Sequence, residues 1–295
     1  MLQLSPASAG ETGFIDNRQC FACHKSHKQT FQNSAHSRAF AADTESGCQS
    51  CHGGGGAHKE VAGQENYTGP LKIESFKKGS GTAEDKNRFC LACHQKDARR
   101  SHWMGSAHQS RDLDCTSCHQ IHTAQDKVRD KRTQPEVCST CHQDKRLEIN
   151  KPSHHPIPEG KMACSDCHNP HGSAGPKLMK RDSVIETCYT CHMEKRGPFV
   201  HNHQPVTEDC TICHNPHGTV AENLLKMRPP FLCHQCHSPH GPASLALTGQ
   251  VATPLAIAKN QINYTQGRGC VNCHNQIHGT NNPANTQANP QFLLR

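Results

Sequence analysis

Apolar residues along this chain follow neither of the periods that mark long regular elements. Hydrophobic residues make up 33% of the 295 positions and aromatic residues 4%, and no useful stretch alternates between apolar and polar residues as a half-buried strand does. Short stretches with an apolar residue at their head, such as Arg88 to Cys90 and Ser183 to Glu186, predict one or two helical turns each. Residues 53–56 and 281–289 are typical of loop or tail. The pattern therefore predicts mostly coil with short α-helices and almost no β-structure.

So few apolar side chains cannot build an ordinary core for a chain of this length. Intrinsic disorder is one reading of such a composition. The other is a fold whose core is supplied by bound groups, because chains poor in apolar residues depend on covalent or metal staples. No run of 18 apolar residues occurs, so the sequence contains no segment that would span lipid directly.

A five-residue pattern, Cys-x-x-Cys-His, decides between these readings. It occurs ten times and uses all twenty cysteines. The ten copies lie at residues 20–24, 48–52, 90–94, 115–119, 138–142, 164–168, 188–192, 210–214, 233–237 and 270–274. Their cysteines are Cys20, Cys23, Cys48, Cys51, Cys90, Cys93, Cys115, Cys118, Cys138, Cys141, Cys164, Cys167, Cys188, Cys191, Cys210, Cys213, Cys233, Cys236, Cys270 and Cys273, and their histidines are His24, His52, His94, His119, His142, His168, His192, His214, His237 and His274.

This spacing suits covalent haem. Cysteines at i and i+3 lie on one side of a helical turn, where both thiols can form thioethers with one porphyrin edge. The histidine that follows then becomes the proximal axial ligand of the iron. Zinc ribbons use paired Cys-x-x-Cys units without a histidine after each pair, and redox dithiols occur once per domain near a βαβ pattern. We therefore predict ten c-type haems, whose porphyrins form the core, and an apoprotein that is largely unfolded.

The formal charge of +7 changes sign once haem is included. Two ionised propionates on each haem outweigh the charge of the ferric cores, giving roughly −3 in the oxidised protein and roughly −13 in the reduced one. Lysine and arginine are scattered, and pairs such as Lys77-Lys78 and Arg99-Arg100 are either propionate partners or solvated surface. The sequence therefore does not support binding to nucleic acid.

The ends of the chain carry no motif. Residues 1–9 end in Ala7-Ser8-Ala9, which resembles the end of a cleaved leader, and they are either a leader remnant or a disordered N-terminus. Residues 10–279 form a single predicted array of ten haems, and residues 280–295 a C-terminal tail. Because attachment of haem c takes place outside the bacterial inner membrane, we expect an exported protein. Two long spacers, 53–89 and 238–269, are insertions or partner-contact loops.

Histidines beyond the motifs repeat as well. After the first, third, fifth and seventh motifs a spacer leads to another histidine, whereas after the second, fourth, sixth and eighth a histidine arrives sooner, as in His168-Asn169-Pro170-His171-Gly172. The ninth and tenth motifs follow the short form. The unit is thus a two-haem repeat of roughly 45 to 50 residues, which predicts a one-dimensional array and an elongated rod.

Ten distal ligands follow from this repeat: His36, His58, His108, His122, His155, His171, His203, His217, His240 and His278. They leave His27, His102, His154, His201 and His234, which we interpret as surface or propionate-bonding residues, although His154/His155 and His201/His203 are ambiguous neighbours. The methionines keep no constant offset from the motifs and are interpreted as packing residues. Every haem is therefore predicted to be bis-histidine, which leaves no vacant position for chemistry at iron. The repeat does not say which distal histidine serves which haem.

Ten motifs at these spacings, with Thr187 to His192, Glu194 to Pro198 and Cys213 to Gly218, resemble the MtrA/PioA/DmsE family of decahaem cytochromes over residues 20–279. The resemblance implies a periplasmic electron carrier inserted in an outer-membrane β-barrel porin. Its further partners would be an outer-surface multihaem cytochrome and periplasmic or inner-membrane cytochromes. Our leading hypothesis is an electron conduit across the outer membrane with no catalytic residues, working outward to ferric minerals or inward from ferrous iron. The alternatives are a soluble periplasmic donor to a terminal reductase and a multihaem reductase, the latter disfavoured by the uniform motif set.

Physics supports the barrel independently. A polar, loop-rich backbone would leave its amides unsatisfied in lipid, so it can cross a hydrocarbon layer of about 30 Å only inside a protein lumen. A row of ten haems is also far longer than a soluble one-electron shuttle requires.

Overall fold

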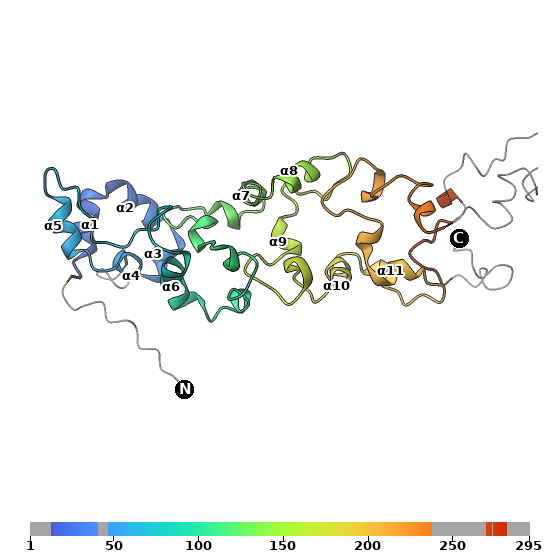
Figure 1. The fold of residues 1–295 in the computed structure, drawn as a ribbon, viewed down its shortest axis with the longest axis horizontal. Helices are drawn as coiled ribbons and strands as arrows, with labels where there is room; N and C mark the ends of the chain where they lie inside the picture. Colours follow the sequence, from blue (N-terminus) through green and yellow to red (C-terminus); the bar gives the residue numbers. More distant parts are fainter. Residues whose placement is uncertain (1–12, 41–46, 238–269, 273, 282–295) are drawn as a thin grey trace, which may run out of the picture. The chain divides into compact units, whose positions relative to one another are not determined.

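A computed structural model describes residues 13–40, 47–237, 270–272 and 274–281. The described chain consists of short helices joined by long loops (Figure 1). The α-helices are α1 (Asn17–Cys23), α2 (Lys25–Gln32), α3 (Ala35–Ala39), α4 (Gln49–His52), α5 (Gly56–Ala62), α6 (Ala83–His94), α7 (Gln134–Cys138), α8 (Gln143–Ile149), α9 (Cys164–Cys167), α10 (Val184–Tyr189) and α11 (Gln204–Glu208). The 3₁₀ turns are η1 (Ala98–Arg100), η2 (Gln109–Arg111), η3 (Cys115–Ser117), η4 (Lys127–Arg129), η5 (Pro176–Leu178), η6 (Met193–Lys195), η7 (Cys210–Ile212), η8 (Glu222–Leu224), η9 (Cys233–Gln235) and η10 (Cys270–Asn272).

The helices begin where the sequence offers a cap. Thr82 and Asp85 form a capping box at α6, and Ser183 accepts the amide of Glu186 at 3.2 Å to start α10. The turn expected around Arg88 to Cys90 is part of the twelve-residue α6, so helix there is longer than predicted because the box stabilises its first turn. The spacer after the second motif also contains α5, which begins at Gly56 inside a stretch predicted as loop.

Strands are absent from the part of the chain that the structure describes. Four isolated bridges occur instead: Ser153 with Thr219, His168 with Met179, His201 with Thr280, and His214 with Leu225. The prediction of mostly coil with short helices is thus confirmed. In the same described ranges, no helix is long and apolar enough to cross a membrane.

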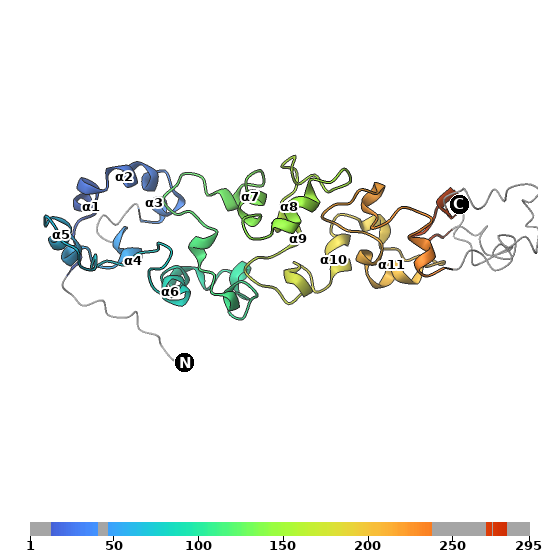
Figure 2. The same cartoon turned by 45° about the horizontal axis from the view of Figure 1, so that its top comes forward.

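The chain divides into two compact units. The first comprises residues 1–140 and 169–172 and holds α1 to α7, and the second comprises residues 141–168 and 173–295 and holds α8 to α11. Within the first unit, α1, α2 and α3 lie along one edge and α5, α4 and α6 along the other in the view of Figure 2. The predicted single array and elongated rod stay predictions.

Protein side chains alone give little core to either unit. The buried apolar residues of the described chain are Val61, Trp103, Ile149, Ile157, Ala163, Met179, Tyr189 and Ala221, and no large side chain among the described residues is fully buried. Interiors of folded proteins are normally packed as densely as organic crystals. A fold with so little apolar interior needs bound groups to fill it, as expected from the composition.

The start of the predicted C-terminal tail is tied to the second unit. Thr280 exchanges two backbone hydrogen bonds with His201, both 3.0 Å, and Asn281 accepts the amide of Val200 at 2.7 Å. The boundary between array and tail at residue 279 stays a prediction.

Candidate haem sites

The motifs form the single helical turns that their spacing predicts. At eight of them the amide of the motif histidine donates to the carbonyl of the first cysteine at 2.9–3.0 Å, namely at His24, His52, His119, His168, His192, His214, His237 and His274. The third motif lies within α6. The described residues include nineteen of the twenty cysteines. Each described turn thus presents thiols and an imidazole for one prosthetic group.

Motif histidines face the histidines that the repeat selected as distal ligands. Eight such pairs have ring centroids 5.9–6.3 Å apart: His24 with His58, His52 with His122, His94 with His36, His119 with His171, His168 with His217, His192 with His155, His214 with His278, and His237 with His203. Each pair joins one residue of a motif to one residue outside the motifs.

This separation fits an iron held between two imidazoles. Two opposed metal–nitrogen bonds of about 2 Å each, with the radius of each ring added, place the centroids about 6 Å apart. Rings in direct stacking contact would be closer than this, and unrelated surface histidines would show no common distance. The residues present therefore fit haem iron with two axial histidines.

The pairs follow an interlaced order along the chain. A distal histidine after an odd motif faces the motif two further on, as His36 faces His94 and His203 faces His237. A distal histidine after an even motif faces the motif two before it, as His122 faces His52 and His171 faces His119. His58 follows the second motif, has no such motif before it, and faces His24 of the first.

Hydrogen bonds at Nδ1 orient several of these imidazoles. Among motif histidines, Nδ1 of His52, His168 and His214 lies 2.8–2.9 Å from a backbone carbonyl, of Glu74, Lys177 and Asn223 respectively. Nδ1 of His119 lies 2.6 Å from a carboxylate oxygen of Asp126. A proton on Nδ1 leaves the lone pair of Nε2 free to bind a metal and fixes the ring orientation.

Distal histidines are held in the same manner. Nδ1 of His58 donates to the carbonyl of Leu71 at 2.7 Å, and those of His108 and His155 donate to the carbonyls of Pro170 and Pro216 at 2.8 and 2.7 Å. The sequence reasoning missed these acceptors. The two proline carbonyls could have been found, because both lie in the repeated sequence His-Asn-Pro-His-Gly.

That repeated sequence forms a tight turn. The Asn169 side chain accepts the amide of His171 at 3.2 Å and donates to the carbonyl of Gly172 at 2.6 Å, and Asn215 bonds to His217 and Gly218 in the same way. Gly172 and Gly218 have φ of +107° and +146°, and a Cβ there would overlap the carbonyl oxygens of His102 and Glu148. Only glycine fits both the backbone angle and the space.

Burial keeps many of these imidazoles neutral. It lowers the pKa of His171 to about 4, and the neighbouring His119 adds to the effect. Burial is also the main cause that lowers the pKa of His24, His36, His94, His122, His168, His203, His214, His217 and His278. Because only the neutral imidazole binds a metal, the environment favours ligation.

Other histidines lie outside these pairs. The ring centroid of His27 lies 5.9 Å from that of His24 and 4.7 Å from that of His122, so His27 adjoins two pairs. His154 Nε2 is 3.1 Å from Glu159, and that hydrogen bond raises the pKa of His154. Nε2 of His201 is buried without a hydrogen bond. The axial roles predicted for the motif histidines and for the ten histidines of the repeat stay predictions, and His240 and Cys273 lie outside the described residues.

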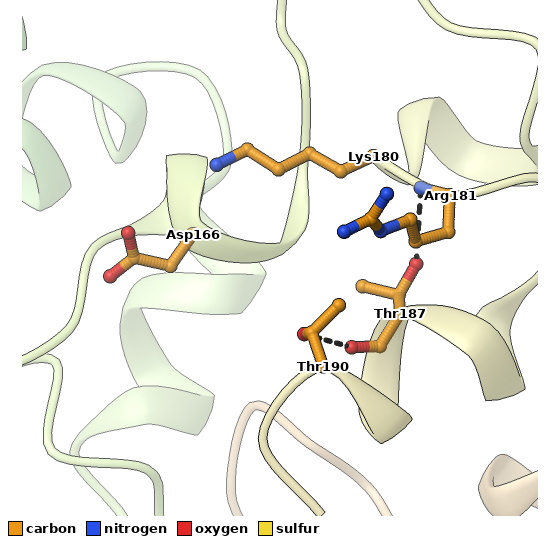
Figure 3. A pocket seen from close by; sticks show the side chains of 5 residues that line it. All are labelled: Asp166, Lys180, Arg181, Thr187 and Thr190. Carbon is orange, nitrogen blue, oxygen red and sulfur yellow. Dashed lines mark hydrogen bonds between the residues drawn. The ribbon is translucent and has the colours of Figure 1, made fainter. Parts of the chain in front are cut away.

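A cavity of about 380 Å³ adjoins the sixth and seventh motifs. It is lined by Asp166, Lys180, Arg181, Thr187 and Thr190, with the Lys180 side chain reaching toward Asp166 and the Arg181 guanidinium lying near the threonines (Figure 3). The Lys180 amide donates to the carbonyl of Cys167 at 2.9 Å, which holds this segment beside the sixth motif. The Lys180 and Arg181 cations suit a carboxylate such as a porphyrin propionate, whereas the Thr187 and Thr190 hydroxyls donate to backbone carbonyls and Asp166 adds a negative charge to the lining.

Comparison with known proteins agrees with these sites. The model of a doubled CXXCH motif matches residues 154–197 and 203–242, and that of NrfB-like cytochrome c-type proteins matches residues 48–134. Multiheme cytochrome MtrA of Shewanella baltica is 47% identical over 238 residues, covering 80% of this chain and 68% of the relative. The chain belongs to the MtrA family of multihaem cytochromes. Cytochrome c-type protein NrfB of Haemophilus influenzae is 30% identical over 112 residues, covering 35% of this chain and 48% of that protein.

Membership in the MtrA family establishes the coarse chemistry. The paired motifs and their cysteines bind c-type haem covalently, and a multihaem cytochrome of this family transfers electrons. The opposed imidazoles, their Nδ1 acceptors and the neutral state favoured by burial are compatible with that chemistry.

Proposed function

We propose that this MtrA-family chain carries ten haems, each held between two histidines, and conducts electrons across the outer membrane within a β-barrel porin. The interlaced histidine pairs carry the proposal, because eight motif histidines already face a second imidazole at the distance that iron requires. Haem supplies the one-electron chemistry, since its iron is stable in two oxidation states.

The chain's own residues support conduction over catalysis. Two imidazoles on one iron leave no coordination position for a substrate, whereas chemistry at a metal requires an open one. By the mirror image of the rule that pairs His58 with the first motif, His240 after the ninth motif serves His274 of the tenth. With that assignment both ends of the array are closed by a histidine of the neighbouring motif.

A barrel is the partner that the physical properties favour. Backbone carbonyls and amides in loops need hydrogen-bond partners, which lipid does not supply and a protein lumen does. We further propose a periplasmic location at the outer membrane, an outer-surface multihaem cytochrome on one side, and periplasmic or inner-membrane cytochromes on the other. Electron flow either outward to metal acceptors or inward from ferrous iron is compatible with such a row.

The similarity of residues 48–134 to NrfB-like cytochromes supports a second candidate. In that case the protein is a soluble periplasmic donor to a terminal reductase and works without a barrel. Both candidates use the same haem ligands, so they differ only in whether electrons cross a membrane.

Transfer across liposomes separates the two candidates. The cytochrome is purified with any barrel that co-isolates and placed in liposomes that contain reduced viologen dye, and ferric citrate is added outside. We expect rapid dye oxidation that depends on the cytochrome, while liposomes with the barrel alone stay reduced. No oxidation with the complex shown to be assembled would contradict the conduit and favour the soluble donor.

A further inference from the structure

The even-numbered motifs differ in what their proximal histidine bonds to. In the second, sixth and eighth motifs the Nδ1 of His52, His168 and His214 meets a neutral backbone carbonyl. In the fourth motif the Nδ1 of His119 meets the carboxylate of Asp126 at 2.6 Å. Of these four proximal histidines, His119 alone thus has a charged acceptor at its Nδ1.

The carboxylate is held in place by the surrounding backbone. One oxygen of Asp126 accepts from His119 and the other accepts the amide of Gln120 at 3.2 Å. The Asp126 side chain is 13% exposed and that of His119 29%, so water screens the contact only partly. At the seventh motif, by contrast, Glu194 is 3.7 Å from His192 and both side chains are more than half exposed.

The sixth motif provides a comparison within the same chain. Its facing histidine, His217, has Nδ1 3.4 Å from a carboxylate oxygen of Glu148, and that carboxylate is paired with the Lys145 ammonium at 2.9 Å. The rings of His119 and His171 are 6.0 Å apart at an interplanar angle of 8°, and those of His168 and His217 are 6.2 Å apart at the same angle. Both proximal rings donate from Nδ1 at hydrogen-bond distance. The charge of the acceptor is the clearest difference between the two proximal histidines.

A carboxylate acceptor changes the ligand electronically. It draws the Nδ1 proton toward itself, which raises the electron density and basicity of the imidazole that faces the metal. A more basic ligand and a nearby negative charge stabilise the ferric state more than the ferrous state, because the ferric iron carries one more positive charge. The potential of that haem therefore falls relative to one whose histidine meets a carbonyl.

We propose that Asp126 is a positioning residue that sets the haem of the fourth motif at a lower potential than the haem of the sixth. An electron then occupies the fourth site less than the sixth, and passage through the fourth site is an uphill step in the chain. Only one electron moves, and no bond forms or breaks. The inference rests on the proposed ligation of iron by His119 and His171.

Spectroelectrochemical titration of the holoprotein tests the proposal with Asp126→Asn. We expect all haems to remain bound and the reduction potential of one haem to rise by about 59 mV, which is about a tenfold change in the equilibrium constant of a one-electron couple. Asp130→Asn is the control, because Asp130 lies in the same segment and bonds to Arg132 and Gln125. Unchanged potentials in Asp126→Asn, or an equal rise in the control, would overturn the proposal.

A second comparison leaves Asp126 intact. His171→Met and His217→Met each shift the couple of one haem, so the titration identifies the wild-type potentials of the fourth and sixth sites. We expect the couple shifted by His171→Met to lie below the one shifted by His217→Met, and the reverse order would overturn the proposal. If His171→Met shifts no couple, the ligand assignment itself has failed. If it shifts a couple while Asp126→Asn shifts none, ligation stands and the role of Asp126 does not.

Discussion

The loops that follow the sixth and eighth motifs repeat each other 46 residues apart, whereas the first two motifs are held by different residues. Lys180 and Lys226 donate from their amides to Cys167 and Cys213 at 2.9 and 2.8 Å. Lys177 and Asn223, whose carbonyls hold the proximal histidines, both have left-handed φ, of 53° and 56°. The repeated loops therefore preserve backbone hydrogen bonds while the side chains along them change.

In the first two motifs, side chains join one motif to the next, while Nδ1 of His52 meets the backbone carbonyl of Glu74. Asn17, three residues before Cys20, accepts the amide of Cys48 at 3.3 Å, and the Gln49 side chain bonds to both the amide and the carbonyl of Ile15. An equivalent asparagine joins the third and fourth motifs, because the Asn87 side chain accepts the amide of Cys115 at 2.8 Å. The difference shows that buried amides join motifs near the N-terminus, whereas repeated backbone turns position the histidines in the sixth and eighth.

Loss of haem should unfold both regions and is expected to have the largest effect on stability among the changes proposed. Neither region has enough apolar interior to fold without its prosthetic groups. We expect chain produced without haem attachment to show no cooperative thermal transition in far-UV circular dichroism, while the holoprotein shows one. A cooperative transition in the haem-free chain would contradict this account of the core.

Replacement of a distal histidine should affect one haem at a time. Methionine is a weaker donor to ferric iron than histidine and raises haem potential. We expect His171→Met and His217→Met each to keep the full haem content. Each should raise the reduction potential of one haem by about 0.1–0.2 V, within the span of about 0.8 V that axial ligands cover. An unchanged set of potentials in a redox titration would show that the pairing with His119 or His168 is wrong.

Alanine at the glycines of the repeated turn should cost stability in both copies. In Gly172→Ala and Gly218→Ala the new Cβ meets a carbonyl oxygen and the backbone angle is unfavourable, so the free energy of unfolding should fall by about 1–3 kcal/mol more than in the control. Gly105→Ala is the control, since Gly105 has φ of +81° with no atom near its Cβ position. Thermal melts that show equal losses in all three variants would remove steric overlap as the cause.

Removal of the buried asparagines should have the smallest effect. Asn87→Ala leaves the Cys115 amide without its acceptor and should lower the free energy of unfolding by about 1–2 kcal/mol. Asn17→Ala should cost less, because its bond to Cys48 is longer. Asn33→Ala, at an exposed position, serves as the control for chemical denaturation. Equal losses for Asn33 and Asn87 would contradict the role of the latter.

Sequence alone predicted the parts of the site that depend on neighbouring residues. The motif turns follow from cysteines three residues apart, and the eight described pairs each contain one histidine that the repeat selected. The repeat did not select His27, whose ring centroid also lies 5.9 Å from that of His24. Short helices and the absence of strands in the described ranges also followed from the lack of periodicity.

Pairing could not be predicted, because it depends on contacts between distant residues. His24 and His58 are 34 positions apart, whereas His52 and His122 are 70 apart, and nothing local distinguishes one candidate from another. The role of Asp126 could not be predicted either. At the sixth motif the acceptor of the histidine Nδ1 is a backbone carbonyl, which any residue supplies, whereas at the fourth motif it is the Asp126 side chain, whose position depends on how the loop folds.

Low-temperature EPR of the oxidised holoprotein tests most directly the central claim, that opposed histidines occupy both axial positions of every iron. The account predicts only low-spin ferric signals, integrating to ten per chain, one for each of the ten motifs. A substantial high-spin signal would show an iron with an open position. It would contradict the bis-histidine array and bring back a reductase with a substrate-accessible haem.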